Sequence, residues 1–318
     1  MKRQNNLFEK ICDIQNLHEA CYKASKHKRQ SLEYLCFSEN LELKLESIRQ
    51  DLLSGNYCFS GYRQFKISDP KERIISAAPF KDRVIHHAII NILEPIFERQ
   101  LVFHTYACRK GKGTHAAARH AFKMAKSFNC FLKLDVRKYF DSINHTVLKK
   151  LLCRIIKDVS CLKLLFAVID GYATEENRGL PIGNLTSQFF ANLYLSPLDH
   201  YILEHLKPGA YVRYMDDMIL FDDSMDSLKN MFNIISCFCC KKLYLKLKQP
   251  SFGKTIHGVP FLGWRLSSSR IGLLGKTKRR MHVKIQEINR DYLNNKVGEE
   301  KTISRIQSVL AARKLFNN

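Results

Sequence analysis

Two apolar runs enclose a pair of adjacent aspartates in the second half of the chain. The runs are residues 211–214 and 218–221, and Met215, Asp216 and Asp217 lie between them. Two short apolar runs joined by a few residues predict a β-hairpin. Side chains alternate faces along a strand, so only a turn lets two adjacent carboxylates approach one point. The fold must therefore contain antiparallel strands, with two carboxylates at the tip of one hairpin.

A third carboxylate, Asp135, ends another apolar segment, residues 131–135, which we predict to be a strand. Carboxylates held close together repel unless a cation or a proton lies between them. Oxygen ligands favour Mg²⁺ or Mn²⁺. Three carboxylates on two neighbouring strands can hold two metal ions about 4 Å apart, as in polymerases and nucleases. For the Asp-Asp pair by itself, a solvated turn without a metal is the favoured interpretation.

The charge of the chain indicates a polyanionic partner. Lys and Arg total 52 and Asp and Glu total 30, so the net charge is +22. Residues 99–134 hold eight Lys or Arg and no acid, and residues 276–284 hold five and no acid. A solvated face is the alternative, but we favour a surface that follows nucleic-acid phosphates. The residues expected to contact RNA are Arg109, Lys110, Lys112, Lys278, Arg279 and Arg280.

The Cys content and the hydropathy pattern favour a cytoplasmic protein. Eleven Cys with no secretory signal at the start predict free thiols in a reducing compartment. The pair Cys237 and Cys240 lacks the second Cys or His pair of a zinc site. No run of 18 apolar residues is present, so we expect no membrane span.

Periodicity gives a coarse map of elements. Residues 1–60 read as helical, and helices are also expected over 84–97, 147–170 and 185–206, where Pro197 is a possible kink. Short strands are expected near 65–67 and 74–75. Residues 179–184 read as a loop, and the last fifty residues as basic and helical.

At this point several motifs together resemble reverse transcriptases. Tyr214-Met215-Asp216-Asp217 is similar to their third palm motif, and residues 134–143 (LDVRKYFDSI) are similar to the first. The resemblance implies an α+β right-hand polymerase: an N-terminal helical extension (1–60), fingers and palm (61–266) with an antiparallel sheet carrying the Asp-Asp hairpin, and a short basic helical thumb (267–318). It implies an RNA-directed DNA polymerase that uses two Mg²⁺ ions, with Mn²⁺ as a substitute.

The resemblance also assigns metal ligands and a steric gate. Asp135, Asp216 and Asp217 become the ligands and catalytic carboxylates, with the Val136 carbonyl as a possible extra ligand. Phe140 falls where such enzymes keep an aromatic ring against the sugar 2′ position. A core position is the alternative for Phe140.

Cations are assigned in the same way. Lys66 and Arg73 have the spacing of two fingers residues that grip the incoming triphosphate, with Lys81 and Arg83 as alternatives. Lys254 is a candidate general acid for the pyrophosphate leaving group, with Lys246 and Lys248 as competitors. Residues 261–264 (FLGW) are similar to the primer grip, a tight turn under the primer end.

The loop before the long palm helix points to one branch of the family. It reads LPIGNLTSQ, with Ile182, Gly183 and Gln188 at the positions expected to contact the nucleotide and template. This loop sequence resembles that of reverse transcriptases of diversity-generating retroelements. Five further short motifs resemble the same enzymes: IISA (74–77), FKDR (80–83), YACR (106–109), KGTH (112–115) and HG (257–258). Packing against the next helix is the alternative for Ile182.

That branch implies a bacterial or phage-encoded enzyme that copies a template-repeat RNA into adenine-mutagenised cDNA, a process called mutagenic retrohoming. Its partners would be template RNA, the cDNA or primer, deoxynucleoside triphosphates and a small basic accessory variability protein. A retron, group II intron-like or phage-defence reverse transcriptase is the alternative, since it would share every palm residue. A non-catalytic RNA-binding protein on the same scaffold is a further alternative, and the presence of all three Asp argues against it.

Overall fold

The computed structural model describes residues 3–68 and 72–314. These residues form two compact units, each built from three stretches of the chain. The first unit takes the described parts of Met1–Phe103, Val136–His205 and Ile235–Lys248, and the second takes those of His104–Asp135, Leu206–Ile234 and Gln249–Asn318. Each unit is described by itself.

Helices dominate the first unit, as periodicity predicts for residues 1–60 and 84–97. The N-terminal helices and the long helix that packs on them are α1 (Phe8–Cys12), α2 (Ile14–Ser25), α3 (Leu32–Ser38), α4 (Leu41–Leu53) and α5 (Phe80–Glu98). Asp13 caps α2 by accepting from the backbone N–H groups of Gln15 and Asn16. The face of α5 that packs on α1 and α2 is apolar, so burial of that stripe holds the bundle together.

Two short strands form a hairpin in the first unit, as expected from residues 65–67 and 74–75. They are β1 (Arg63–Ile67) and β2 (Arg73–Ala77), and their antiparallel register places Arg63 opposite Ala77 and Ile67 opposite Arg73. Arg63 and Arg73 therefore lie at opposite ends of this hairpin.

The remaining helices of this unit are α7 (Tyr139–Ser142), α8 (His145–Ile155), α9 (Val159–Asp170) and α10 (Leu185–Tyr201), which continues as a π-helical turn, Ile202–Leu206. The helix predicted over 147–170 is thus two helices, because Asp158 caps a second one: its carboxylate accepts from the Cys161 N–H. Residues 179–184 form no helix or strand, as expected.

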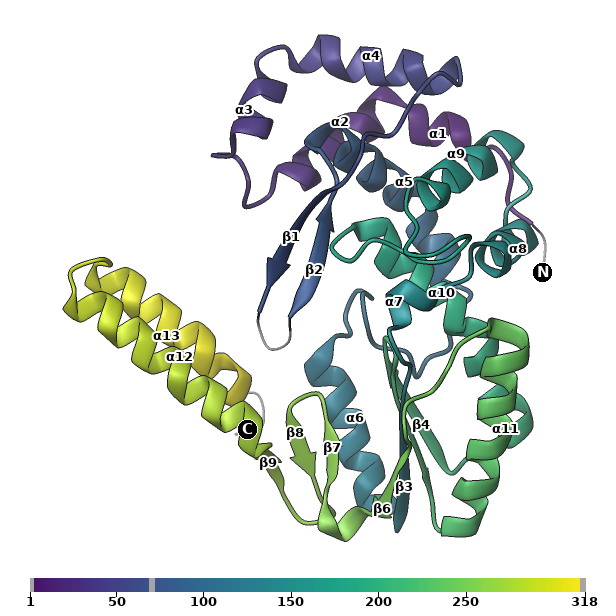
Figure 1. Ribbon diagram of the computed structural model, residues 1–318, viewed down its shortest axis with the longest axis vertical. Coiled ribbons are helices and arrows are strands. Elements are labelled where there is room, and N and C mark those ends of the chain that lie inside the picture. The colour runs from purple at the N-terminus through teal and green to yellow at the C-terminus, as the bar shows by residue number, and fades with distance from the viewer. Residues whose placement is uncertain (1–2, 69–71, 315–318) are drawn as a thin grey trace. The chain divides into compact units, whose positions relative to one another are not determined.

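An antiparallel sheet of four strands forms the centre of the second unit (Figure 1). Its spatial order is β4 (Ala210–Tyr214), β5 (Asp217–Asp222), β3 (Cys130–Asp135), β6 (Ser251–Lys254). Cys130, Phe131, Leu132 and Leu134 of β3 are all buried, so both faces of the strand are covered. Helix α6 (Thr114–Ser127) packs on one face. On the other, Phe252 of β6 meets Phe232 of α11 (Met225–Leu243), a helix whose second half belongs to the first unit.

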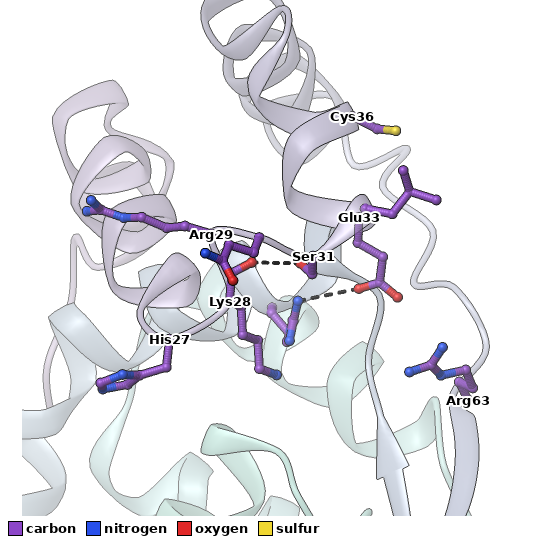
Figure 2. A pocket seen from close by; sticks show the side chains of 10 residues that line it. His27, Lys28, Arg29, Ser31, Glu33, Cys36 and Arg63 are labelled. Atoms are coloured by element: carbon purple, nitrogen blue, oxygen red, sulfur yellow. Dashed lines mark hydrogen bonds and ion pairs between the residues drawn. The ribbon is translucent and has the colours of Figure 1, made fainter. Parts of the chain in front are cut away.

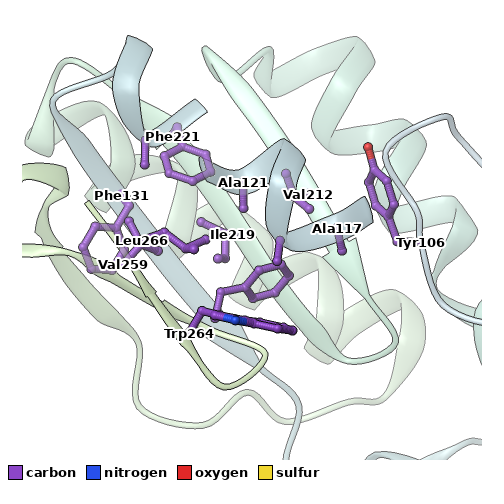
Figure 3. Close-up of a cluster of buried hydrophobic side chains, with 13 residues drawn as sticks. Tyr106, Ala117, Ala121, Phe131, Val212, Ile219, Phe221, Val259, Trp264 and Leu266 are labelled. Carbon is purple, nitrogen blue, oxygen red and sulfur yellow. The ribbon is translucent and has the colours of Figure 1, made fainter. Parts of the chain in front are cut away.

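A hydrophobic cluster joins α6 and the sheet to a small three-stranded sheet (Figure 3). That sheet has the order β7 (Val259–Phe261), β8 (Trp264–Leu266), β9 (Ile271–Leu273), preceded by a 3₁₀ turn, Thr255–His257. Phe131, Ile219 and Phe261 are buried in the cluster, and burying a side chain of this size stabilises a fold by about 1.5–3 kcal/mol. The β7–β8 turn is Leu262-Gly263, both with positive φ, which confirms the tight turn expected there.

The chain continues into two helices, α12 (Gly275–Leu293) and α13 (Glu299–Lys314), which pack on each other. The last fifty residues are therefore mainly helical, but strand β9 precedes the helices. The motif-poor ending, residues 311–318, gives no sequence sign of a further helix, yet α13 continues through 311–314; residues 315–318 lie outside the described residues. The boundaries proposed for extension, fingers–palm and thumb stay a prediction.

All eleven Cys are free thiols, as expected for a reducing environment. Among the described helices, none combines the length and apolarity needed to cross a bilayer.

Candidate active site

The three predicted carboxylates converge in the second unit. Asp135 is the last residue of β3 and Asp217 the first of β5, and the two are directly opposite in the antiparallel register. Asp216 belongs to the two-residue turn between β4 and β5. Only Asp216 is in that turn, whereas both carboxylates were expected at the tip. Met215 has φ of 53°, and this left-handed residue makes a two-residue turn possible.

A lysine that the sequence analysis did not single out contacts this cluster. The Nζ atom of Lys133 lies 3.2 Å from Oδ2 of Asp217 and donates a hydrogen bond of 3.1 Å to the Pro260 carbonyl. Lys133 precedes Asp135 by two residues, so both side chains emerge on the same face of β3. The two-residue spacing of Lys133 and Asp135 in a predicted strand could have indicated this contact from the sequence.

Burial makes Asp217 an unusual carboxylate. Its side chain is 22% exposed, and Oδ1 is buried and accepts no hydrogen bond from any described residue. Burial raises the pKa of Asp217 to about 6; Lys133 opposes this rise, and the nearby charges of Asp135 and Asp216 add to it. At Asp217, burial and the two neighbouring carboxylates therefore outweigh the favourable contact with Lys133.

The cluster fits a divalent cation by its chemistry. Carboxylate oxygens are the preferred ligands of Mg²⁺ and Mn²⁺, and a cation would satisfy the buried Oδ1 of Asp217 and lower its pKa. Within the described residues, no three His, Cys, Asp or Glu side chains are already arranged as metal ligands. Ion binding would therefore require the carboxylates to adjust. Val136 follows Asp135 directly and is fully buried.

A buried arginine supports the turn that carries Asp216. Arg213 is fully buried, and its Nη1 donates a hydrogen bond of 3.0 Å to the Met215 carbonyl. The backbone of Arg213 also pairs with the segment before α6: its N–H donates to the His104 carbonyl, and its own carbonyl accepts from the Tyr106 N–H. These bonds fix the position of the turn relative to the sheet. The sequence pattern gave no sign of this role, because burial of an Arg cannot be read from spacing.

Lys254 is not close to the carboxylates. It pairs with Cys130, at the opposite end of β3 from Asp135. Five residues of extended strand separate the two positions by about 17 Å, more than a lysine side chain can span. We therefore do not assign Lys254 as the general acid.

A cavity of about 1050 Å³ in the first unit collects several other predicted residues. Arg73 and Ile182 line it, and so does Lys246, one of the competitors for the general acid. Three further cations in its wall were not predicted: Arg137, Lys138 and Arg178. Burial raises the pKa of Asp141, another lining residue, against the lowering effect of Lys138. Five Lys or Arg against three acids make this cavity suited to an anion.

The loop that contains Ile182 is hydrogen-bonded to strand β2. The Ser76 N–H donates to the Ile182 carbonyl at 2.9 Å, and the Asn184 side chain donates to the Ser76 carbonyl at 3.1 Å. Gly183 has φ of 113°, and a Cβ there would lie 2.8 Å from Cγ2 of Ile75. Gly183 is thus required by both its backbone conformation and the close approach of β2. Ile182 faces the cavity, which favours the contact role over packing alone.

The other nucleotide candidates are less clearly placed. Lys66 does not line the cavity but forms a 2.9 Å ion pair with Glu72, which does. Phe140 is half-buried, with its ring centroid 5.8 Å from that of Tyr139, so it is not a core residue. Gln188 is half-buried in the first turn of α10.

The two alternatives to the fingers cations lie elsewhere in the first unit. Lys81 forms an ion pair with Asp51 at 3.3 Å and lies over the ring of Tyr57. Arg83 lines a different cavity, described below. Neither lines the cavity of Arg73, which favours Arg73 among the predicted cations.

The predicted RNA contacts differ in exposure. Arg109 and Lys112 are half-buried, and both donate to the Thr105 carbonyl, at 2.8 and 3.3 Å. Lys110 between them is exposed. The three cations Lys278, Arg279 and Arg280 are exposed near the start of α12. Arg109 and Lys112 thus also stabilise their own loop, a role that charge counting does not reveal.

Comparison with known proteins identifies similar chains. A family model described as reverse transcriptase (RNA-dependent DNA polymerase) matches residues 66–266. Protein YkfC of Escherichia coli is 26% identical, over 72% of this chain and 73% of that protein. The group II intron-encoded protein LtrA of Lactococcus lactis is 28% identical over 51% of this chain, and the COX1/OXI3 intron 1 protein of Saccharomyces cerevisiae is 26% identical over 51%. The chain spans only 29% and 20% of the lengths of these two intron proteins.

Solved structures share the fold. A telomerase from Candida tropicalis, truncated from its C-terminal domain, matches with a TM-score of 0.53 at 14% identity, over 68% of this chain and 55% of that one. The same organism's telomerase in complex with a fragment of telomeric RNA gives 0.52 at 10% identity, over 84% and 56%.

Proposed function

The chain belongs to the reverse transcriptase family, and we propose that it is an RNA-directed DNA polymerase whose catalytic carboxylates are Asp135, Asp216 and Asp217. Its α+β fold with antiparallel sheets is that of a right-hand polymerase. The observation that carries the proposal is the register pairing of Asp135 with Asp217, next to the turn that holds Asp216.

We propose Mg²⁺ as the resident ion, with Mn²⁺ as a substitute and the Val136 carbonyl as a further ligand. When bound, two such ions would favour deprotonation of a primer 3′ hydroxyl and would offset the negative charge of the phosphates of a deoxynucleoside triphosphate. The chain's own contribution is to hold the three carboxylates together. Lys133 fixes Oδ2 of Asp217, which leaves Oδ1 for a cation, and Arg213 fixes the turn.

The cavity of the first unit is our candidate for the incoming triphosphate. Arg73, Arg137 and Lys138 bring positive charge to it, and guanidinium groups bind phosphate oxygens with paired hydrogen bonds. Ile182 would meet the base or sugar with an apolar surface. Among the general-acid candidates, Lys246 is favoured over Lys248 and Lys254 because it lines this cavity.

We further propose that the enzyme serves a diversity-generating retroelement. The support is the loop with Ile182, Gly183 and Gln188 together with the phrases quoted above. Template-repeat RNA, cDNA, deoxynucleoside triphosphates and a small basic accessory protein would be its partners, in the cytoplasm of a bacterium.

A group II intron-like reverse transcriptase is the second candidate. The specific observation in its favour is that LtrA and the yeast protein are named as intron-encoded or intron proteins. Such a protein would act on the RNA of its own locus, so sequencing the cDNA made from that RNA distinguishes the two candidates.

The catalytic proposal is tested by primer extension on an RNA template. Asp217→Asn keeps the size of the side chain but removes a charge that the site needs to balance divalent cations. We expect extension to fall by several orders of magnitude, while RNA binding persists. Asp222→Asn is the matched control, because Asp222 ends the same strand, opposite Cys130, and its variant should extend primers normally. Unchanged extension by the Asp217 variant would refute the assignment.

The retroelement proposal is tested at Ile182. An apolar contact reads shape alone and separates partners by only about 1–3 kcal/mol, whereas polar groups that lose their partners separate them by more. We expect Ile182→Gln to lower misincorporation opposite template adenine more than opposite the other bases. Deep sequencing of cDNA made by both proteins on one template measures this. Equal adenine error rates would reject a fidelity role for Ile182.

A further inference from the structure

A second cavity in the first unit has four Lys or Arg among its lining residues. Its volume is about 1080 Å³, and its wall comes from the segment between α2 and α3, from α3 itself, from the start of β1 and from the first turn of α5. Figure 2 shows Lys28 and Arg63 approaching the ion pair of Glu33 from different elements. It shares no lining residue with the cavity of Arg73.

The charges of this cavity are not balanced within the wall. Lys28, Arg29, Arg63 and Arg83 line it together with His27, and Glu33 is the one acid among the lining residues. Glu33 pairs with Arg83 through Nη2 at 3.4 Å, a long contact on a half-exposed carboxylate. Arg29 lies over the ring of Tyr22. Lys28 and Arg63 remain as cations for which the described structure shows no ion pair.

Arg83 is the least exposed of the four cations in the wall; its guanidinium lies 5.2 Å from the centroid of the Phe80 ring, and one of its donors stays unsatisfied. Its side chain is 16% exposed, and its Nε is buried without a hydrogen bond to any described residue. An unsatisfied buried donor costs about 1–3 kcal/mol, more when the group is charged. Burial lowers the pKa of Lys28, and the neighbouring Arg83 lowers it further. A bound anion would relieve both costs at once.

A purely structural role does not explain this arrangement. Elsewhere in this unit, cations are matched one to one with acids, as Lys81 is with Asp51 and Lys149 with Asp170. Here, three cations from three separate elements face one acid. Each guanidinium presents a planar row of donors that matches a phosphate group.

We propose that this cavity binds a phosphate group through Lys28, Arg63 and Arg83, at a site distinct from the carboxylates and from the cavity of Arg73. The phosphate belongs either to the backbone of a bound RNA strand or to a free polyphosphate. The shared chemistry is a dianionic or diester phosphate that meets one ammonium and two guanidinium groups. Occupancy of the site does not require catalysis.

The test uses the full chain with Lys28→Glu and Arg63→Glu combined. Both side chains are exposed, so the variant should fold, and Arg83 is left intact to avoid disturbing α5. The matched control is Lys10→Glu with Arg154→Glu, which makes the same charge change at exposed positions outside both cavities. Thermal unfolding of each protein verifies that it is folded.

The first arm measures binding of a labelled 20-nucleotide single-stranded RNA by fluorescence anisotropy at several salt concentrations. If RNA phosphates occupy the site, the cavity variant should lose about tenfold in affinity. Its logarithmic salt slope should also become shallower by about 0.7, the value for one phosphate contact on a single strand. The control variant should change by much less.

The second arm measures thermal stabilisation by inorganic tripolyphosphate. Stabilisation of the native chain and the control but not of the cavity variant, with RNA affinity unchanged, assigns the site to a free polyphosphate. Equal behaviour of the cavity variant and the control in both arms overturns the proposal. Neither arm uses primer extension, so failure here is separate from failure of the polymerase assignment, and the Asp217→Asn protein should give the same binding results.

Discussion

At the scale of single residues, the buried carboxylate of Asp217 destabilises the folded chain when no cation is bound. Burial and two neighbouring carboxylates raise its pKa to about 6, while Lys133 compensates only in part. Between pH 4 and 6 the folded chain therefore retains a proton that the unfolded chain has lost. The contribution of Asp217 to stability therefore falls as pH rises through this window, because at this group the unfolded state binds fewer protons.

This predicts a pH-dependent difference between the native chain and Asp217→Asn. In EDTA, the variant should gain stability relative to the native chain as pH rises from 4 to 7, by up to about 3 kcal/mol. Adding Mg²⁺ at pH 7.5 should raise the unfolding temperature of the native chain and leave that of the variant nearly unchanged. Thermal unfolding across this pH range, with and without the ion, measures both effects. Parallel pH curves for the two proteins would contradict the role assigned to burial.

The roles of residues could be predicted where they depend on the local sequence pattern. They could not be predicted where they depend on burial in the folded chain. The three aspartates stand out because they end or separate apolar runs, and the register brings two of them opposite each other. The alternation of β3 places Lys133 on the same face as Asp135, but no sequence motif distinguishes it from a surface lysine. Arg213 was not predictable, since a fully buried arginine looks like a surface arginine in sequence. Lys254 was misplaced because spacing along the chain does not give strand register.

At the scale of elements, one carboxylate joins the N-terminal residues to helix α9. Asp158 caps α9 and also accepts hydrogen bonds from the backbone N–H groups of Leu7 and Phe8, at 2.7 and 2.9 Å. Burial alone would raise its pKa, but the backbone hydrogen bonds outweigh burial, and the net shift is downward. The start of α1 thus depends on a residue about 150 positions later in the chain.

We expect Asp158→Ala to destabilise the chain by more than the roughly 1 kcal/mol typical of a lost cap, because the N–H groups of α1 lose their acceptor too. Asp13→Ala is the matched control, since Asp13 accepts only from the start of its own helix. The lowered pKa means that the stabilisation by Asp158 is present above pH 4 and is lost as pH falls through its folded pKa. Urea unfolding at pH 7 and pH 3 measures this, and equal losses in the two variants at pH 7 would argue against the link.

Helices and strands were predicted well where periodicity is strong. The helix α5, the strand β3 and the Asp-Asp hairpin are near their expected positions. The break between α8 and α9 was missed because the apolar pattern continues through it, and only the cap at Asp158 marks the second start. The division into two units was not predictable, because each unit is assembled from stretches far apart in sequence.

At the scale of the whole molecule, the dominant property is the net charge of +22. Part of this charge serves the fold, as Arg109 and Lys112 do at the Thr105 carbonyl. The exposed cations near the start of α12 have no such role among the described contacts. Charge that is not engaged in the fold remains available to phosphates.

The salt dependence of RNA binding measures that available charge. Each phosphate contact contributes about 0.7–0.9 to the logarithmic slope, so we expect a slope steeper than about −4. Charge reversal at Lys278 and Arg279 should make the slope shallower by about 1.4, the contribution of two contacts to a single strand. Filter binding from 50 to 300 mM salt gives these values. A nearly flat dependence would mean that the excess charge is only solvated surface.

The bond between Ser76 and Ile182 has a consequence for how this protein can diverge. Because Ile75 fills the space that a side chain at position 183 would need, β2 and the loop of Ile182 are coupled in their tolerated substitutions. A side chain at position 183 can be accommodated only if Ile75 is replaced by a smaller residue at the same time, and its positive φ would still be strained. Ile182 is joined to β2 through its backbone carbonyl, so replacing its side chain leaves that connecting hydrogen bond in place. The fold therefore restricts substitutions at Ile75 and Gly183 and restricts those at Ile182 less.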